Sequence, residues 1–187
     1  MSNMLLNDKE LKILNVFSND YSRMIYGRDV AKNLGLNQKS VSNALNGLER
    51  KHVLKYKIEG RNKYYFLNRM NPGIKEIIKL IEINRKIEFL GNSKIAELLV
   101  KLEERVNGIL IVFGSYASGR NKKGSDLDLF VVGRVDGIDS LKDVYGIDIN
   151  VVRTTRGKFD KGDIIVKEVM GNHVVLKGVE EFVDLIW

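Results

Sequence analysis

The sequence lacks cysteine altogether, and it contains only one proline, one tryptophan and two histidines in 187 residues. The absence of cysteine excludes disulfides, thiolate-zinc sites and cysteine nucleophiles. His52 and His173 alone cannot build a histidine-rich metal site. Any metal site in this chain must therefore use oxygen ligands, which are the ligands that hard cations prefer.

Long hydrophobic runs are also missing. The longest wholly apolar stretches, residues 109–113 and 129–132, are far shorter than the roughly 18 residues that a membrane-spanning helix needs. The first ten residues include three charged side chains in a row at positions 8 to 10, so they lack the apolar core of a signal peptide. We therefore expect a cytoplasmic protein that has no membrane partner.

Positive charge is concentrated in the N-terminal part of the chain, whose formal net charge is +7. Residues 1–70 contain 13 Lys and Arg against 6 Asp and Glu, whereas residues 71–187 contain 18 of each. This asymmetry is typical of a nucleic-acid-binding segment joined to a segment with another task. On charge alone, a solvated lysine-rich surface is the alternative interpretation.

Three helices are predicted before residue 52. Apolar residues at helical spacing indicate a first helix over residues 8–17, with Asp8 as its cap. A second helix is predicted over residues 27–34, and a third, capped by Asn37, over residues 38–51. The third helix would bury an apolar stripe and expose hydrogen-bonding and basic side chains, which suit base edges and phosphates.

A hairpin with a basic tip follows, from two strand-like runs over residues 53–58 and 63–67. The side chains that we expect to contact DNA come from the third helix and from this hairpin. They are Gln38, Lys39, Ser42, Asn43, Asn46, Lys57, Arg61 and Lys63.

The stretch GRDVAKNLGLNQKSVSNALNGLERKHVL resembles the helix-turn-recognition-helix segment of winged helix-turn-helix transcription regulators. The resemblance covers roughly residues 8–68. It implies that the third helix enters the major groove of double-stranded DNA while the hairpin wing contacts the backbone or the minor groove. We place this domain at residues 1–70. A winged helix used only for dimerisation or protein contact is the alternative.

A linker helix is predicted after the winged helix. Asn71, Pro72 and Gly73 interrupt the pattern, and apolar residues at helical spacing then predict a long helix that is broken at Gly91. A further helix is predicted over residues 94–106. We assign residues 71–92 as the linker, which can connect domains or pack a homodimer, and the sequence does not separate these uses.

An apolar strand over residues 109–113 runs directly into Gly114 and Ser115, and a helix is predicted after them. Two small residues permit a sharp turn, and the amides at the start of a helix can receive phosphate oxygens. Ten residues separate Ser115 from Asp126, and the next strand opens with Asp126 and Asp128. Because strand side chains alternate between faces, these two carboxylates should point the same way.

Paired carboxylates repel each other unless a cation lies between them. Magnesium prefers carboxylates, water and nucleotide phosphates, and it supports in-line displacement at phosphorus. Asp148 is the best candidate for a third carboxylate because it is the sole acid in the apolar run 147–152. Asp136 and Asp143 are weaker candidates because their segment has the composition of a loop. Arg120 can support phosphate or belong to a solvated loop.

The stretch GSYASGRNKKGSDLDLFVV resembles the Gly-Ser, ten residues, Asp-x-Asp signature of the DNA polymerase beta-like nucleotidyltransferase superfamily, and it looks most like the minimal nucleotidyltransferases. The resemblance implies ATP or another NTP as nucleotide donor, Mg²⁺ as cofactor, and a metal site of Asp126, Asp128 and Asp148. It also implies that Gly114, Ser115 and Arg120 lie at the nucleotide. We place this domain at residues 93–187.

The fold class that these observations predict is α+β: an N-terminal winged helix, then a small mixed-sheet nucleotidyltransferase domain flanked by helices. About 39 residues follow Asp148, fewer than the acceptor-binding domain of larger superfamily members would need, so we expect the acceptor to come from elsewhere. In similar small enzymes the acceptor is a partner protein, notably a HEPN-type RNase toxin. Tyr116 and Tyr145 are alternative acceptors. A transcription regulator whose nucleotidyltransferase domain only binds nucleotide or a partner is the alternative function.

Overall fold

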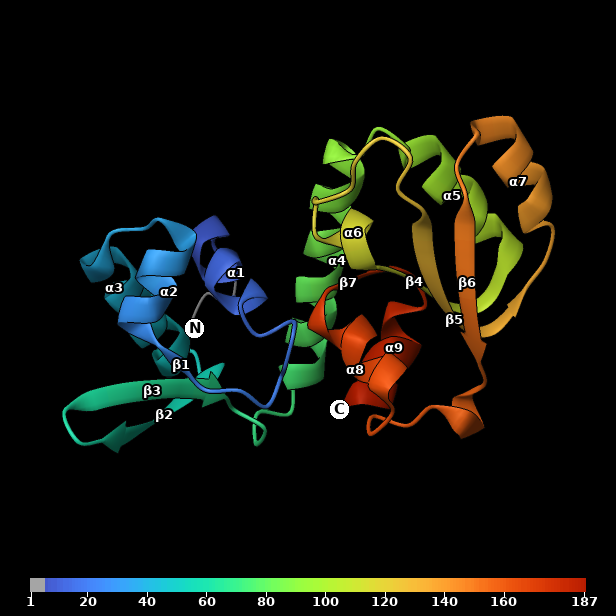
Figure 1. The fold of residues 1–187 in the computed structure, drawn as a ribbon. Helices are drawn as coiled ribbons and strands as arrows, with labels where there is room; N and C mark the ends of the chain where they lie inside the picture. Colours follow the sequence, from blue (N-terminus) through green and yellow to red (C-terminus); the bar gives the residue numbers. More distant parts are fainter. Residues whose placement is uncertain (1–5) are drawn as a thin grey trace. The chain divides into compact units, whose positions relative to one another are not determined.

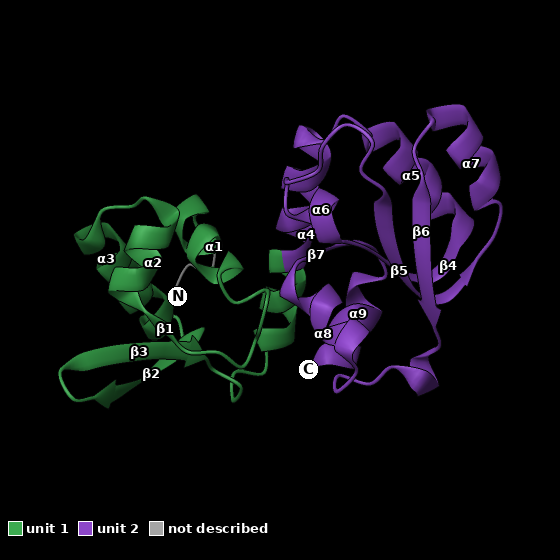
Figure 2. Ribbon diagram, in the orientation of Figure 1, with its two compact units in different colours: residues 1–81 green, residues 82–187 purple. Residues whose placement is uncertain are grey.

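The structure, a computed structural model, describes residues 6–187 and combines helices with two separate β-sheets. The chain divides into two compact units, Met1–Ile81 and Glu82–Trp187 (Figure 2). The boundary between them falls inside one long helix, α4 (Ile74–Asn92). The first five residues of the predicted 1–70 domain lie outside the described part. Within residues 6–187, no helix combines the length and apolarity needed to cross a membrane.

The first unit packs helices against a three-stranded antiparallel sheet of order β1-β3-β2 (Figure 1). Its elements before α4 are α1 (Asp8–Asn15), β1 (Ile25–Tyr26), α2 (Gly27–Leu34), α3 (Gln38–Arg50), β2 (Leu54–Glu59) and β3 (Asn62–Leu67). The predicted second and third helices are confirmed. Gly35 ends α2 in the left-handed conformation, and the Asn37 side chain accepts hydrogen bonds from the amides of Lys39 and Ser40 at the start of α3.

The start of α1 differs from the prediction, because Asn7 caps this helix and Asp8 is its first residue. The Asn7 Oδ1 atom accepts from the Glu10 amide at 3.0 Å, and Glu10 Oε2 accepts from the Asn7 amide at 2.9 Å. This reciprocal pair is a capping box, which satisfies two backbone donors at once. A lone Asp8 cap would satisfy only one side of that exchange. The helix also ends at Asn15, two residues earlier than predicted.

The second unit is built on a four-stranded mixed sheet of order β6-β5-β4-β7, in which only β5 and β6 run parallel. Leucine and valine side chains on one face of the sheet pack with α5 and α7, and α9 packs against β4 and β7 (Figure 1). The elements after α4 are α5 (Ala96–Arg105), β4 (Val106–Phe113), α6 (Gly114–Ala117), β5 (Leu127–Val135), α7 (Ile138–Tyr145), β6 (Ile149–Thr154), a 3-10 turn (Arg156–Lys158), α8 (Ile164–Gly171), β7 (His173–Lys177) and α9 (Val179–Ile186).

Two local expectations for this region are wrong, and one helix was not expected. Gly91 does not break the linker helix, since α4 continues through it to Asn92. A glycine near a helix end costs only about 1 kcal/mol relative to alanine, which tertiary packing easily offsets. Asp143 lies on helix α7 rather than in a loop, and α8 was not anticipated.

A buried charge network joins α4 to β7 inside the second unit. Glu82 and His173 are fully buried, and Arg85 Nη1 lies 3.2 Å from both Glu82 carboxylate oxygens. The Arg85 guanidinium also donates to the backbone carbonyl of His173. His173 is therefore a structural residue, and its Nδ1 lies 3.1 Å from the Met170 carbonyl.

Candidate active site and candidate DNA-binding surface

The turn after β4 places the backbone of Gly114 directly against one of the candidate carboxylates. Gly114 has a φ of +69°, and a Cβ atom built on it would lie 2.6 Å from Asp128 Oδ2. Both the left-handed backbone and the close approach require glycine. The predicted order of a strand, a Gly-Ser turn and a helix holds. The helix, α6, has only four residues, however, and is much shorter than a helix whose dipole would bind phosphate.

Asp126 and Asp128 converge on one side of the sheet, as alternation along β5 predicts. Leu127, which lies between them, is fully buried in the core. One amide group reaches both carboxylates: Asn150 Nδ2 lies 3.2 Å from Asp126 Oδ2 and 3.2 Å from Asp128 Oδ1. This donor partly offsets the repulsion between the two negative charges. All three side chains are at least partly exposed, so the site is open to a ligand.

Asn150 was missed in the sequence analysis. It pairs with Asp128 across the parallel β5–β6 ladder, and it follows Asp148 by two residues. That spacing puts it on the same side of a strand as Asp148, and this was the available signal. The sequence analysis named the carboxylate of Asp148 as the candidate ligand and did not consider the amide of Asn150 two residues later.

Asp148 lies immediately before β6, with its carbonyl accepting from the Leu127 amide at 2.8 Å, and its side chain is exposed. Among residues 6–187, no three His, Cys, Asp or Glu side chains are grouped so that they could hold one metal ion. The structure thus brings together Asp126 and Asp128 with Asn150, and the role of Asp148 as a third ligand stays a prediction.

The loop between the two halves of the motif is fixed by serine hydroxyls. Ser118 Oγ donates to the carbonyls of Gly114 and Ser115, each at 3.0 Å, and it accepts from Arg120 Nε at 3.1 Å. The Arg120 amide closes the same turn onto the Ser115 carbonyl at 2.9 Å. Arg120 is therefore held close to the Gly-Ser turn, which is the place that a phosphate-binding role requires. At the end of α8, Asn172 Nδ2 reaches the Gly114 carbonyl at 3.4 Å.

The two tyrosines considered as acceptors are both engaged by their surroundings. The Tyr116 hydroxyl donates to the Ser125 carbonyl at 3.4 Å, and its ring packs against the core. The Tyr145 hydroxyl donates to Glu97 Oε1 at 2.9 Å. Hydrogen bonds from Lys101 and then from Tyr145 lower the pKa of Glu97 below its ordinary value. Tyr145 packs on the face of the sheet that Leu127 occupies, opposite to Asp126.

The predicted DNA-contacting residues of α3 divide into two groups. Gln38, Lys39, Ser42 and Asn43 are exposed on the outer surface of the helix. Asn46 is instead turned toward the sheet, where its Oδ1 accepts from the Tyr65 hydroxyl at 2.8 Å and from Lys63 Nζ at 3.3 Å. These contacts give Asn46 a structural role whether or not it also reaches DNA.

The hairpin residues divide in the same way. Arg61 is exposed at the turn, next to Gly60, whose φ of +61° closes the two-residue loop. Lys57 is exposed and forms an ion pair with Glu59 at 2.5 Å. Lys63 Nζ lies 3.7 Å from the centre of the Tyr56 ring and is thereby held over the sheet rather than at the tip.

Residues 93–176 match the family model described as nucleotidyltransferase domain. This match supports a transferase enzyme. The nucleotidyltransferase segment includes every candidate active-site residue, from Gly114 to Asn150, and most of the four-stranded sheet.

Two further comparisons concern the whole chain. No curated protein matches this sequence. Among solved structures, a toxin-antitoxin crystal structure with AMP-PNP is similar, with 20% sequence identity and a TM-score of 0.38. That similarity covers 48% of this chain and 78% of the other chain.

Proposed function

We propose that this protein is a magnesium-dependent nucleotidyltransferase that transfers AMP from ATP, or a nucleotide from another NTP, to a partner protein in the manner of an antitoxin. The observation that carries the proposal is the convergence of Asp126 and Asp128 on the Gly114 turn. Two negative charges that share an exposed site are unfavourable without a cation. The close approach of Gly114 to Asp128 also places a backbone turn beside these two carboxylates.

The residues present fit a magnesium ion. Asp126 and Asp128 supply carboxylate oxygens, which are the hard donors that Mg²⁺ selects. The Asn150 side chain donates from its Nδ2 atom to both carboxylates and so holds them together. Bound there, the ion would stabilise negative charge on the attacking and leaving oxygens of a displacement at phosphorus. Asp148 remains the proposed third carboxylate.

The chain's own residues would orient the nucleotide for that displacement. The Ser115 hydroxyl and the amides that follow Gly114 would receive the phosphate oxygens, and Arg120 would pair with the phosphate charge. An acceptor hydroxyl attacks the α-phosphorus, so a new oxygen–phosphorus bond forms while the bond to the bridging oxygen of the β-phosphate breaks. Pyrophosphate leaves, and the hydroxyl proton passes to solvent.

We further propose that residues 1–70 form a winged helix that binds double-stranded DNA. The exposed outer face of α3 and the exposed Arg61 at the hairpin turn support this, together with the excess of positive charge in this part of the sequence. Residues 71–92 would act as a linker helix and residues 93–187 as the minimal nucleotidyltransferase domain. In an antitoxin, DNA binding would act on the protein's own promoter, and a HEPN-type toxin would be the acceptor.

The transfer proposal is tested by mass measurement of intact proteins. The full chain is incubated with isotopically labelled ATP, Mg²⁺ and the product of any neighbouring HEPN-like gene, with Asp128→Ala and Asp143→Ala as paired variants. We expect a nucleotide adduct on the partner protein with the wild type and with Asp143→Ala, since Asp143 is an exposed α7 residue. The adduct should vanish with Asp128→Ala. Adduct formation that survives Asp128→Ala would contradict the proposed site.

A regulator that binds nucleotide without transferring it is the second candidate. It is favoured by Asn150, whose amide already bridges the two carboxylates, and by the absence among residues 6–187 of a grouped third acid. In that case ATP would bind the full chain, with Ser115 and Arg120 still required, but no protein or RNA that is offered would gain mass.

A further inference from the structure

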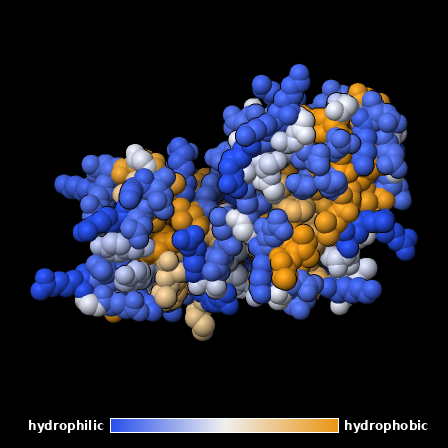
Figure 3. Space-filling view, in the orientation of Figure 1, coloured by the Kyte–Doolittle hydropathy of each residue, from blue (hydrophilic) through white to orange (hydrophobic). Residues whose placement is uncertain are grey.

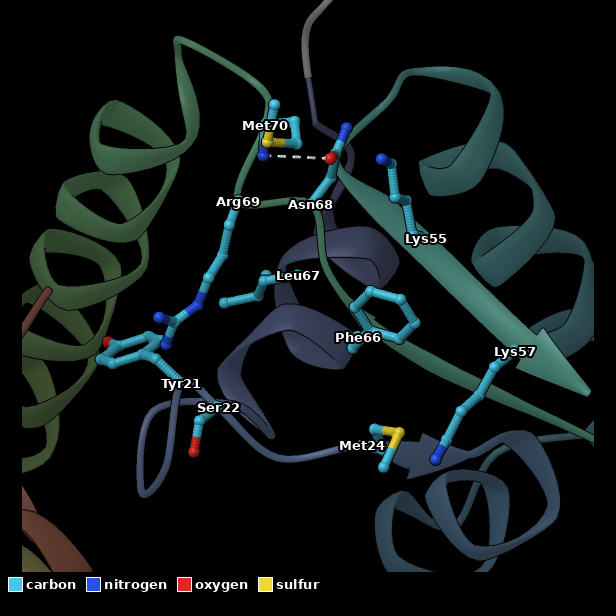
Figure 4. A pocket seen from close by; sticks show the side chains of 10 residues that line it. All are labelled: Tyr21, Ser22, Met24, Lys55, Lys57, Phe66, Leu67, Asn68, Arg69 and Met70. Atoms are coloured by element: carbon cyan, nitrogen blue, oxygen red, sulfur yellow. Dashed lines mark hydrogen bonds between the residues drawn. The ribbon is translucent and has the colours of Figure 1, made fainter. Parts of the chain in front are cut away.

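The first unit contains a pocket of about 510 Å³, and Lys57 is the one residue of its lining that is also proposed to contact DNA. It is formed by the segment before β1, by the strands β2 and β3, and by the loop after β3 (Figure 4). Its volume falls in the range of small-molecule sites, which is roughly 300–1,000 Å³. The residues that line it are Tyr21, Ser22, Met24, Lys55, Lys57, Phe66, Leu67, Asn68, Arg69 and Met70.

The pocket presents an apolar interior. Phe66 and Leu67 lie at its centre in Figure 4, and Met24 and Met70 lie on opposite sides of it. Met24 is 44% exposed and Met70 is 80% exposed, although large apolar side chains are normally buried. Methionine is flexible and polarisable, so two of them around a hollow can adapt to ligands of different shape. Figure 3 shows hydrophobic side chains coming to the surface of this unit beside β3, among hydrophilic ones.

The charged groups of the pocket are all positive. Lys55, Lys57 and Arg69 line it, and none of the ten lining residues, all of which lie in the described chain, is acidic. The nearest acid along the chain, Asp20, accepts hydrogen bonds from both the amide and the hydroxyl of Ser22, at 2.8 and 2.5 Å. Lysines and an arginine above an apolar floor suit a ligand with one anionic end.

The frame of the pocket is held in place before any ligand binds. Asn68 is 6% exposed, its Nδ2 donates to the His52 carbonyl at 2.9 Å, and its Oδ1 accepts from the Met70 amide at 3.2 Å. Asn71 Nδ2 donates to the same His52 carbonyl at 3.1 Å. These bonds fix the loop so that Met70 projects outward, and preorganisation of this kind reduces the entropy lost on binding.

We propose that this pocket binds a small organic anion that has an apolar chain or ring, and that a carboxylate on such a ligand pairs with Lys55. Lys57 lines the same pocket and also belongs to the hairpin residues proposed to contact DNA. A bound anion beside Lys57 therefore lowers DNA affinity, because its negative charge repels phosphate. This second consequence rests on the proposed DNA binding, whereas ligand binding itself does not.

Octanoate, 1-octanol and acetate test the site, with displacement of the fluorescent anion 8-anilino-1-naphthalenesulfonate from the full chain as the readout. Octanoate should displace the dye about tenfold more strongly than 1-octanol, since one charged hydrogen-bonded contact has roughly that effect on affinity. Acetate, which lacks the apolar chain, should not displace it. Equal displacement by octanoate and octanol would overturn the proposed anion selectivity.

Variants locate the binding. Lys55→Gln should weaken octanoate about tenfold without weakening octanol, and Met70→Ser should weaken both ligands. Lys32→Gln is the control, because it removes one exposed positive charge of the same unit outside the pocket. Unchanged octanoate affinity in Lys55→Gln, or an equal loss in Lys32→Gln, would place the anion elsewhere and overturn the proposal.

The coupling to DNA is measured separately, as the affinity of a duplex for the full chain with and without saturating octanoate. A fall in DNA affinity that Lys55→Gln abolishes supports the coupling. Octanoate binding without any change in DNA affinity overturns the coupling and leaves the ligand site standing. A chain that binds octanoate but no duplex contradicts the proposed DNA binding alone, so the failures are distinguishable.

Discussion

The two units differ in whether their charged side chains are balanced by a partner within the protein. At the candidate active site of the second unit, two carboxylates are brought together with a single shared amide donor, Asn150, and a backbone turn is pressed against one of them. At the candidate DNA surface of the first unit, several of the cations are already engaged: Lys57 with Glu59, and Lys63 with tyrosine rings. Charge left unbalanced in a rigid site indicates a missing counterion, whereas charge balanced within the protein contributes mainly to structure.

The largest effect that tests this contrast is expected at Asp128. Asp128→Ala should reduce nucleotide transfer by on the order of a thousandfold, because it removes a proposed ligand of the magnesium ion, whose charge would stabilise the transition state. In metal-free buffer the melting temperature of the variant should equal or exceed that of the wild type, since the repulsion from Asp126 is relieved. Thermal unfolding with EDTA and with Mg²⁺ measures this.

Asp143→Ala serves as the matched control for that change, because it removes an exposed carboxylate of the same unit that lies on α7. It should leave transfer and both melting temperatures unchanged. A marked loss of stability of Asp128→Ala in EDTA would mean that the carboxylate is structural, and the contrast between the units would then fail.

The buried network of α4 should show the next largest effect. Arg85→Met leaves Glu82 buried without its cation, and breaking a buried pair in this way costs about 3–5 kcal/mol of the free energy of unfolding. Lys79→Met removes an ion pair of the same i,i+3 spacing on the same helix, but its partner Glu76 has a 71% exposed side chain. That control should cost less than about 1 kcal/mol. Similar losses in urea unfolding for the two variants would refute the structural role of the network.

Gly114 should be more sensitive than a neighbouring glycine of the same backbone type. Gly114→Ala combines left-handed strain with a contact of 2.6 Å to Asp128 Oδ2, and we expect a loss of about 2–3 kcal/mol together with weaker transfer. Gly119 has a φ of +65° and no atom within 4 Å of an added Cβ. Gly119→Ala should therefore cost only the backbone strain, about 1–2 kcal/mol. Equal stability and equal transfer activity of the two variants would show that the close approach of Gly114 to Asp128 contributes to neither property.

The smallest effects are expected at the DNA surface, and they separate free cations from engaged ones. Lys39→Ala and Arg61→Ala should each weaken duplex binding several-fold and lower the salt slope by about 1, because each removes one phosphate contact. Lys63→Ala should change DNA affinity less and should instead cost about 0.5–1 kcal/mol of stability through the lost contact with Tyr56. Salt-dependent fluorescence anisotropy and thermal unfolding report the two quantities. A larger affinity loss for Lys63→Ala than for Lys39→Ala would reverse this ranking.

The sequence by itself determined the elements that depend on local signals. Helices α2 and α3, the hairpin and the strand that enters Gly114 follow from caps, turn residues and apolar periodicity, which act over a few residues. The same face for Asp126 and Asp128 also followed, because alternation along a strand is a property of the backbone.

Only the tertiary structure decided which distant residues meet. The pairing of β5 with β6 places Asn150 against the two carboxylates, and a strand register cannot be read from either strand alone. The same is true of Asn46, which local periodicity put on the outer face of α3 but which Tyr65 and Lys63 hold against the sheet.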